Sequence, residues 1–395
     1  MIASAVAAAA LVIAGAGPGA PIPATAFGQH VSLQSPPTGV SFTSVRLWDN
    51  GVRWDEIERR QGSYDWAPLD AAVANAQAAG ATDILYVLGS TPEWAARDPN
   101  MPGLYGNGTT SLPARPEYYL DFVREVTKRY QGRINAYQIW NEANTRSFYE
   151  GDWTALARLT RRAYDVIKLH DPGAQVVGAS STVIPDDLFA TESFFVRYAR
   201  ALHAAGDPVD AMSVHLYPVD TSKGPDSRAA SIRAAQRVLN KVGIDRPLWD
   251  TEVNYGDRRP GLPTVVPDPV TGATYVARTY LDSVTQGIAR TYWYGWDRHT
   301  LGVDLVDSNG ITAAGQAFLT VRDWLTGARA GGCQEVAGTQ RCRFVGADGA
   351  PFTVVWATSS PVTLATPGMQ VCRLDGSCED SGESTTIDAA PVLLK

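Results

Sequence analysis

Lysine is scarce in this sequence, and none of its lysines closes a run that resembles a β-strand; the five are Lys128, Lys168, Lys223, Lys241 and Lys395. Enzymes that work through a Schiff base need a lysine amine in the active site, so this chemistry is not expected. Basic residues as a whole are outnumbered by acidic ones, 34 to 41, which gives a net charge of −7. Nucleic acids and anionic membranes select basic surfaces, so neither is expected as the main partner.

Charged side chains are absent from the chain until Arg46. Residues 2–13 have the length and apolarity of a signal-peptide core, and residues 14–16 and 24–26 both offer a small-x-small cleavage pattern. The positive charge that usually opens such a peptide is missing. We expect residues 1–24 to be a signal peptide or an N-terminal membrane anchor, although the apolar run is short for a span. The protein is then expected to be secreted or held at the cell surface.

Cysteine is absent before residue 333, and the four cysteines are Cys333, Cys342, Cys372 and Cys378. An even number gathered at one end of an exported chain predicts two disulfides. Pairing of neighbours, Cys333 with Cys342 and Cys372 with Cys378, is the simplest of three connectivities. The spacing contains no C-x-x-C, so a zinc site is not expected. We expect no cofactor.

What the chain does contain is a regular alternation of short apolar runs and helical patterns. Helical spacing of apolar residues predicts helices at 69–79, 119–130, 153–170, 194–205, 229–242, 275–287 and 313–325. Eight strand-like runs lie around them, at 26–30, 44–48, 83–88, 136–144, 175–179, 210–217, 247–254 and 290–296. Strands separated by helices pair in parallel, so this pattern predicts an α/β fold, a closed (β/α)8 TIM barrel over residues 25–327. A doubly wound open sheet is the alternative, but no glycine-rich phosphate-binding turn follows the first strand.

The pattern changes beyond residue 327 to short strands between turn residues, at 343–345, 352–356 and 361–364. This predicts a small all-β domain over residues 328–395, which carries the four cysteines. Such a domain could be a structural cover for the barrel or a carbohydrate-binding surface.

Two of the predicted strands end on a glutamate. The run 136–144 reaches Glu142 where strand becomes loop, and the run 247–254 closes on Glu252. Glu142 alone could be a solvated loop residue or a helix cap. In a (β/α)8 barrel, however, the carboxyl ends of the strands meet at one face, where the active site lies. A pair of carboxylates is what glycoside hydrolysis requires.

The other strand ends carry aromatic rings and hydrogen-bonding groups that suit a sugar. They are His30, Arg46, Trp48, Trp94, Asn141, His215, Tyr217, Trp293, Trp296 and Asp297. Trp48 and Trp94 could equally be core residues, and His30 and His215 could be structural. The two histidines lack a third ligand at suitable spacing, so no metal is predicted. Asp250 shares strand parity with Glu252 and is expected to point into the barrel and pair with an arginine.

The stretch Trp140-Asn-Glu-Ala-Asn144, with a glutamate ending the seventh strand, resembles glycoside hydrolase clan A. The segments Val45-Arg-Leu-Trp-Asp49, Trp54-Asp-Glu-Ile-Glu58 and Thr91-Pro-Glu-Trp94 are most similar to family 39 and its bacterial exopolysaccharide-hydrolase relatives. The likeness covers residues 26–326.

This resemblance implies a retaining mechanism, with Glu142 as the acid/base and Glu252 as the nucleophile. It also implies that Arg46 keeps Glu252 ionised and that Asn141 binds the sugar 2-hydroxyl. We expect Tyr217 to hydrogen-bond Glu252, and His215 to orient a neighbour or contact the substrate. The stacking floor under the sugar is expected from Trp293 or Trp296, and the approaches from Trp48 and Trp94.

Two other functions remain open. A glycan-binding protein could keep the barrel without cleaving, although a decayed site would be expected to have lost one of the four polar residues that are all present (Glu142, Glu252, Asn141 and Arg46). A transglycosylase would use the same two carboxylates and differ only in what attacks the intermediate. The sugar is not determined, since xyloside, glucan, arabinofuranoside and acidic targets all occur among clan relatives. The segments 99–116 and 255–274 are expected to shape the cleft.

Overall fold

The structure, a computed structural model, describes residues 19–32, 40–49, 51–182, 192–296 and 299–395. Most of the predicted signal peptide or anchor lies outside the described residues, and so does Asp297.

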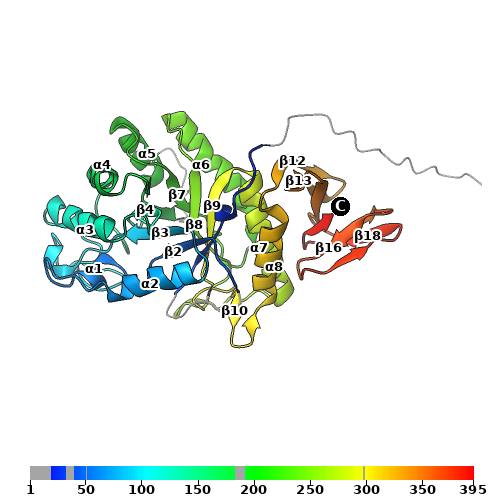
Figure 1. The fold of residues 1–395 in the computed structure, drawn as a ribbon, viewed down its shortest axis with the longest axis horizontal. Coiled ribbons are helices and arrows are strands. Elements are labelled where there is room, and N and C mark those ends of the chain that lie inside the picture. The colour runs from blue at the N-terminus through cyan, green and yellow to red at the C-terminus, as the bar shows by residue number, and fades with distance from the viewer. Residues whose placement is uncertain (1–18, 33–39, 50, 183–191, 297–298) are drawn as a thin grey trace, which may run out of the picture.

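Nine parallel strands form the central sheet, in the spatial order β5-β4-β3-β2-β1-β9-β8-β7-β6 (Figure 1). They are β1 (Phe27–His30), β2 (Ser44–Leu47), β3 (Asp83–Leu88), β4 (Ala136–Ile139), β5 (Gln175–Val177), β6 (Ser181–Thr182), β7 (Met212–His215), β8 (Leu248–Val253) and β9 (Ile288–Tyr294). The short strands β5 and β6 are two pieces of one barrel position, because β5 pairs with β4 and β6 pairs with β7. A parallel bridge between Val177 and Ala211 joins the two ends of the sheet. The predicted (β/α)8 barrel is confirmed, with one predicted strand at each position.

Helices cover the outside of the barrel and connect its strands (Figure 1). They are α1 (Trp54–Ile57), α2 (Ala67–Ala78), α3 (Pro116–Arg129), α4 (Trp153–His170), α5 (Phe194–Ala204), α6 (Arg228–Val242), α7 (Pro269–Thr285) and α8 (Ala313–Leu325). All seven predicted helices are present, and α1 is an additional single turn. Helix α7 begins six residues earlier than the prediction, because Asp268 caps it and Pro269 occupies its first position. The insertion before it therefore ends at residue 268.

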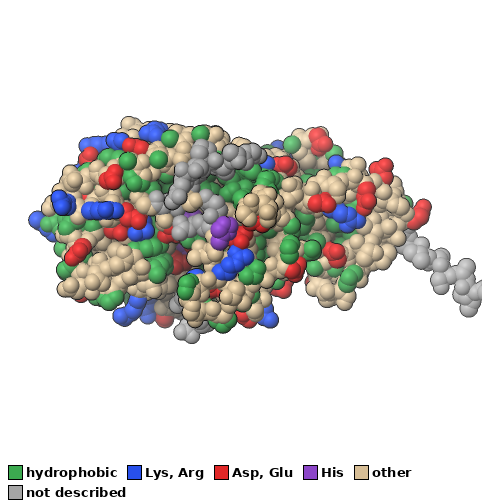
Figure 2. All heavy atoms as spheres, turned by 90° about the horizontal axis from the view of Figure 1, so that it is seen from below, with side chains coloured by type: hydrophobic (Ala, Val, Ile, Leu, Met, Phe, Trp, Pro, Cys, Tyr) green, Lys and Arg blue, Asp and Glu red, His purple; other side chains and the backbone are tan. Residues whose placement is uncertain are grey.

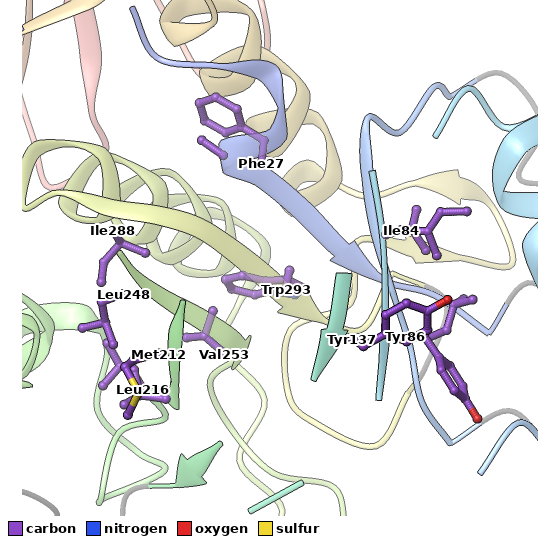
Figure 3. Close-up of a cluster of buried hydrophobic side chains, with 14 of the residues drawn as sticks. Phe27, Ile84, Tyr86, Tyr137, Met212, Leu216, Leu248, Val253, Ile288 and Trp293 are labelled. Carbon is purple, nitrogen blue, oxygen red and sulfur yellow. The ribbon is translucent and has the colours of Figure 1, made fainter. Parts of the chain in front are cut away.

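Two layers of buried side chains hold the barrel together. The larger layer fills the space between strands and helices, where Figure 3 shows Phe27, Ile84 and Trp293. A separate cluster fills the barrel interior and includes Leu85, Trp249 and Tyr292, from β3, β8 and β9. Gly28 on β1 faces that interior, and a Cβ there would overlap the ring of Tyr292. Only glycine leaves room for the ring at this point.

The chain beyond α8 forms two antiparallel sheets beside α7 and α8 (Figure 1). The strands are β12 (Arg329–Val336), β13 (Thr339–Val345), β14 (Pro351–Ala357), β15 (Val362–Ala365), β16 (Gln370–Cys372), β17 (Cys378–Asp380), β18 (Ser384–Ile387) and β19 (Val392–Leu394). A small hairpin, β10 (Val306–Asp307) and β11 (Gly310–Ile311), precedes α8. The predicted C-terminal all-β part is confirmed.

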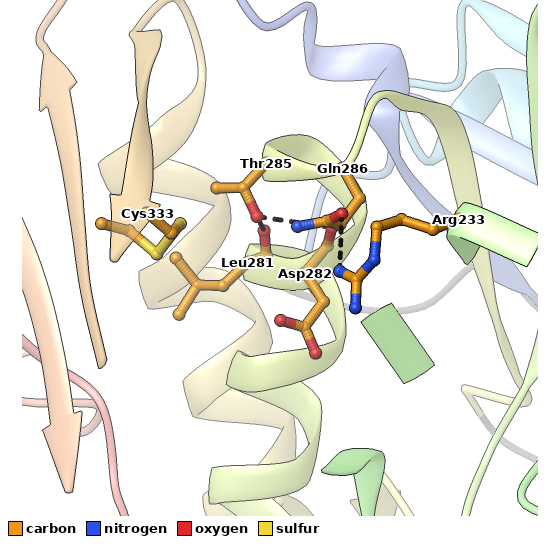
Figure 4. The surroundings of a disulfide bond; sticks show 7 residues. Arg233, Leu281, Asp282, Thr285, Gln286 and Cys333 are labelled. Carbon is orange, nitrogen blue, oxygen red and sulfur yellow. Dashed lines mark hydrogen bonds between the residues drawn. A yellow bond between two sulfur atoms is a disulfide. The ribbon is translucent and has the colours of Figure 1, made fainter. Parts of the chain in front are cut away.

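Both disulfides join cysteines that are neighbours in the sequence. Cys333 bonds to Cys342 between β12 and β13, and Cys372 bonds to Cys378 between β16 and β17. Each pair lies directly opposite in its antiparallel ladder, which is why neighbouring cysteines meet. The first disulfide lies beside α7, close to Leu281 (Figure 4).

The surface of the described chain carries charges of both signs. On the face in Figure 2, basic and acidic side chains are interspersed among larger uncharged areas. Among the described residues, no helix is both long and apolar enough to cross a membrane.

Candidate active site

Glu142 stands just beyond β4, where the backbone turns sharply. Trp140 and Glu142 both have positive φ angles, 67° and 41°, which side-chain-bearing residues seldom adopt. The Oγ atom of Ser180 accepts a hydrogen bond from the backbone N–H of Glu142 at 2.9 Å. Asn144 exchanges two hydrogen bonds with the backbone of Thr182, at 2.9 and 2.8 Å. Polar residues of the fifth barrel position therefore hold the turn that presents Glu142.

Glu252 lies near the end of β8, and each of its carboxylate oxygens accepts a hydrogen bond. Arg46 on β2 donates from Nη1 to Glu252 Oε1 at 2.5 Å. The hydroxyl of Tyr217, two residues after β7, donates to Glu252 Oε2 at 2.9 Å. The Glu252 side chain is only 7% exposed, so its position is fixed by these two partners rather than by water.

Arg46 also organises the residues around this carboxylate. Its Nη2 donates to Asn141 Oδ1 at 2.8 Å, and its Nε donates to Gln138 Oε1 at 3.4 Å. Its Nη1 lies 3.3 Å from His30 Nδ1. Arg46 itself is completely buried. One guanidinium thus joins the ends of β1, β2, β4 and β8 at a single point.

His215, the last residue of β7, lies between the two glutamates. Its Nδ1 atom is 2.9 Å from Glu142 Oε1 and 3.4 Å from Glu252 Oε2. An irregularity in the pairing of β7 with β8 between Val214 and His215 places His215 opposite Glu252. Thus five of the predicted polar residues, Arg46, Asn141, Glu142, His215 and Glu252, meet at the carboxyl ends of the strands, and Tyr217 joins them.

The same irregularity changes where Asp250 points. Asp250 forms an ion pair at 2.7 Å with Arg228, the first residue of α6. It also accepts a hydrogen bond from the backbone N–H of Leu216 at 3.1 Å. The expected pairing with an arginine is confirmed, but the expected direction is wrong. Asp250 faces the helix layer, because the bulged register breaks the strict alternation of sides along β8.

The two glutamates share burial as the main influence on their pKa, but they have different partners. Burial raises the pKa of Glu142 to about 7. Burial also raises the pKa of Glu252, but the adjacent Arg46 charge opposes that rise. Burial lowers the pKa of His215 to about 3, so this imidazole is neutral near pH 7. A single negative charge in the site is therefore best stabilised on Glu252, beside the cation.

The carboxylates are close enough to act on one bond. A carboxylate oxygen of Glu142, one of Glu252 and a ring nitrogen of His215 all lie within 4.8 Å of one another. Carboxyl groups about 5–5.5 Å apart are typical of retaining glycosidases, whereas inverting enzymes separate them by about 6.5–9.5 Å. Among the described residues this is also the one trio that could hold a metal, but the buried Arg46 cation against Glu252 disfavours a second positive charge there.

The predicted aromatic residues occupy different surroundings. Trp293 is fully buried and lies among core side chains in Figure 3, with its ring 5.8 Å from that of Tyr255. Trp296 packs edge-on against Phe42 and Phe318. The structure thus places both tryptophan rings in the layer between strands and helices.

Trp48 and Trp94 also differ from each other. Trp48 is buried and lines a small hollow together with Tyr105, Trp140 and Asn141. Trp94 is half-buried and donates from its indole nitrogen to the carbonyl oxygen of Glu58 at 2.6 Å. Trp48 therefore lies beside the polar residues of the site, whereas Trp94 ties the turn after β3 to the segment after α1.

Three residues near the site were not identified from the sequence. Asp49, just beyond β2, accepts a hydrogen bond from the Tyr294 hydroxyl at 2.8 Å and another from the Tyr105 hydroxyl. The Tyr294 ring lies 4.5 Å from that of His30. Strand alternation offered a signal for Tyr294, because it follows the outward-facing Trp293 on β9. Nothing in the sequence pattern indicated that the loop carrying Tyr105 would reach Asp49.

The fold is shared with several solved glycosidases, although no protein-family model matches the sequence. A family 39 glycoside hydrolase from Bacteroides cellulosilyticus superposes with a TM-score of 0.71 at 18% identity, covering 94% of this chain and 80% of that one. A glucosidase from Croceicoccus marinus gives 0.65 at 16% identity, with 96% of each chain covered. A monomeric β-xylosidase from Caulobacter crescentus gives 0.65 at 15% identity, covering 96% and 97%. The likeness to family 39 and clan A that the motifs indicate therefore extends to the fold.

Proposed function

We propose that this protein is a glycoside hydrolase that cleaves O-glycosidic bonds with retention of anomeric configuration. The observation that carries the proposal is the asymmetric pair of buried carboxylates. Glu252 contacts a buried arginine at 2.5 Å, while Glu142 contacts the neutral His215 at 2.9 Å. In this proposal Glu252, beside the arginine cation, acts as the anion, and Glu142, whose pKa burial raises to about 7, acts as the acid. Glycoside hydrolysis requires these two roles.

In the first step, Glu252 attacks the anomeric carbon while Glu142 gives its proton to the departing oxygen. A covalent glycosyl-enzyme forms and the glycosidic bond breaks. In the second step, Glu142 removes a proton from water, and the water displaces Glu252 from the sugar. The pKa of Glu142 falls once Glu252 is esterified, because the neighbouring negative charge has gone. The same residue can therefore act first as acid and then as base.

Three residues around the two glutamates have supporting roles in this mechanism. Asn141 accepts from Arg46 through its carbonyl oxygen, which leaves its amide hydrogens to bind the sugar 2-hydroxyl. Tyr217 holds Glu252 Oε2, so that Glu252 presents its carboxylate in a fixed orientation. His215 Nδ1 lies close to an oxygen of each glutamate, so the imidazole can orient both carboxylates. The imidazole is neutral near pH 7.

We also propose that residues 25–327 form the catalytic unit, residues 328–395 an accessory β unit, and residues 1–24 an export signal or anchor. The two disulfides support export, since such bonds persist in oxidising compartments. The similar structures include a glucosidase and a β-xylosidase, so aryl β-glucosides and β-xylosides are the first substrates to test.

The mechanism is tested by replacing each glutamate and adding azide. Glu252→Ala is expected to lose turnover of an aryl glycoside and to regain it with azide, giving a glycosyl azide of inverted configuration. Glu142→Ala is the matched control, since with an activated leaving group it should give a glycosyl azide of retained configuration. Full activity of Glu252→Ala without azide would contradict the proposal.

A further inference from the structure

The segment between β8 and α7, residues 254–268, carries an exposed cation at the carboxyl end of the barrel. This cation is Arg259, whose side chain is 54% exposed. Its Nε atom donates to both oxygens of Asp257, at 3.0 and 3.1 Å, and its Nη2 atom donates to Oδ2 at 2.6 Å. The Asp257 side chain is only 2% exposed. The anion of this ion pair is therefore turned toward the protein, and the cation toward the solvent.

The backbone around this ion pair is tightly packed. Asp257 and Val265 exchange two backbone hydrogen bonds of 2.9 Å, which close the segment into a narrow loop. A Cβ atom on Gly256 would lie 2.3 Å from the carbonyl oxygen of Val265, so only glycine leaves room for this approach. The N–H of Gly256 donates to the carbonyl oxygen of Thr221 at 3.2 Å, which joins the loop to the segment after β7. The fold thus fixes the backbone from which Arg259 extends.

Arg259 is close enough to the candidate catalytic residues to act on them through its charge. Burial raises the pKa of Glu142, and the positive charge of Arg259 is one of the influences that oppose this rise. The hydrogen bond to Asp257 is the main reason why the pKa of Arg259 is raised, and Tyr217 and Glu142 contribute in the same direction. In the proposed mechanism Glu142 gives its proton to the departing oxygen. Arg259 therefore acts on the residue beside which the leaving group must lie.

The guanidinium of Arg259 keeps hydrogen-bonding capacity for a ligand. Asp257 occupies Nε and one proton of Nη2, whereas Nη1 has no hydrogen-bond partner within the described chain. Arg46, the other arginine whose charge acts on Glu142, is completely buried and has a partner on each nitrogen. Asp49 also acts on Glu142, with the opposite sign. An anionic group of a ligand is therefore favoured where Arg259 is nearer to it than Asp49.

We propose that Arg259, oriented by Asp257, binds a carboxylate on the leaving group, so that the enzyme selects glycosides in which an acidic group follows the cleaved bond. This inference rests on the proposed glycosidase function. Hydrogen bonds between arginine and a carboxylate are charge-assisted and stronger than neutral ones, and a guanidinium has five protons to share between two carboxylates. The acidic group can belong to a uronic acid or to an aromatic acid, because both present the same carboxylate.

The test compares leaving groups that differ in one charge on the same sugar, β-D-glucose or β-D-xylose. The first pair has 4-carboxyphenyl and 4-carbamoylphenyl leaving groups, and the second has glucuronic acid and glucose as the leaving sugar. In Arg259→Gln the acidic-to-neutral ratio of kcat/KM is expected to fall by about fivefold or more, because two opposite charges about 4 Å apart attract each other by about that factor even in water. The effect of the substitution on Glu142 cancels in this ratio, since both substrates of a pair need the same proton.

Two controls accompany this variant. Arg161→Gln removes another exposed arginine that pairs with an aspartate, on α4, and it should leave the ratio within about twofold of the wild-type value. Added salt screens charges near the surface, so the wild-type ratio is expected to fall as NaCl rises from about 0.05 to 0.5 M. Loss of the preference in the first pair alone would identify an aromatic acid as the ligand, and loss in the second pair alone would identify a uronic acid.

An unchanged ratio for both pairs in a folded Arg259→Gln protein would overturn the inference. A wild-type ratio that does not respond to salt would overturn it as well, so the test does not depend on the folding of the variant. In both cases glycosides are still cleaved, and the proposed function stands. Failure of the wild-type protein to cleave any glycoside in a broad panel would instead remove the proposed function on which the inference rests.

Discussion

Arg46 Nη1 lies 2.5 Å from Glu252 Oε1, and the two side chains are 0% and 7% exposed. A charge pair withdrawn this far from water must be well matched, because desolvation costs each ion several kcal/mol. Here the arginine also binds Asn141 and Gln138. The Arg46 charge therefore opposes the rise that burial causes in the pKa of Glu252, and the same guanidinium holds the residues at the end of β4.

Replacing Arg46 is expected to affect both activity and stability. Arg46→Met leaves Glu252 buried without its cation, so the pKa of Glu252 should rise and the acid limb of the kcat/KM profile should move to higher pH. We expect kcat to fall by about a hundredfold or more, and stability by about 3–5 kcal/mol. Steady-state kinetics from pH 4 to 9 and urea unfolding would measure these effects.

Arg161→Met is the control for that substitution. Arg161 pairs with Asp165 on the exposed face of α4, and such surface pairs contribute about 0–1 kcal/mol. Kinetics indistinguishable from wild type in Arg46→Met would contradict the role given to this residue.

The pH dependence of kcat/KM is expected to follow the protonation of Glu142. Burial raises its pKa to about 7, and the proton must be present for the first step, so kcat/KM is expected to fall as pH rises above about 7. Glu142→Gln should lose this limb. The variant should keep the first step for a dinitrophenyl glycoside, whose leaving group needs no proton, and lose it for an alkyl glycoside. A basic limb that persists in Glu142→Gln would assign it to another group.

His215 is expected to contribute no limb to the pH profile of kcat/KM. Burial lowers its pKa to about 3, so no limb between pH 5 and 8 is expected from it, although histidine ordinarily titrates there. Direct observation of the imidazole by NMR in the resting protein would check this. A His215 titration midpoint near 6.5 would show that burial does not keep the ring neutral.

The ion pair between Asp250 on β8 and Arg228 on α6 is expected to stabilise the fold. Asp250→Ala leaves Arg228 buried beside Ser283 without its counter-charge, and we expect a loss of about 3–5 kcal/mol in urea unfolding. The double variant Asp250→Leu with Arg228→Met should recover much of that loss, since a well-packed apolar pair avoids the desolvation cost. Equal stabilities of the single and double variants would contradict this account.

The disulfides should stabilise the C-terminal sheets without affecting catalysis. They close short loops, with sequence separations of 9 and 6, so loss of either is expected to cost about 2 kcal/mol. The paired variant Cys372→Ser with Cys378→Ser should lower the unfolding midpoint and leave kcat/KM within about twofold. A large loss of activity at a temperature where the variant remains folded would show that these sheets contribute to the site.

The sequence alone determined the architecture and was enough to predict Glu142 and Glu252 as the candidate catalytic pair. Alternating apolar runs and helical patterns are local features, and a barrel follows from their order and number, because parallel strands need helical crossovers. Glu142 and Glu252 could be placed because each closes a strand, and strand ends converge in this fold. Cysteines that face one another across a hairpin likewise meet for a local reason.

Only the tertiary structure decided which side chains turn toward that pair. The direction of Asp250 depends on an irregularity between two strands, and that of Asp49 on a left-handed backbone angle. The contact between Tyr105 and Asp49 depends on the course of a long loop. Such details arise from packing between segments far apart in the chain, which periodicity within one segment does not encode. The sequence therefore predicted which carboxylates form the candidate site, and the three-dimensional packing decided which residues surround them.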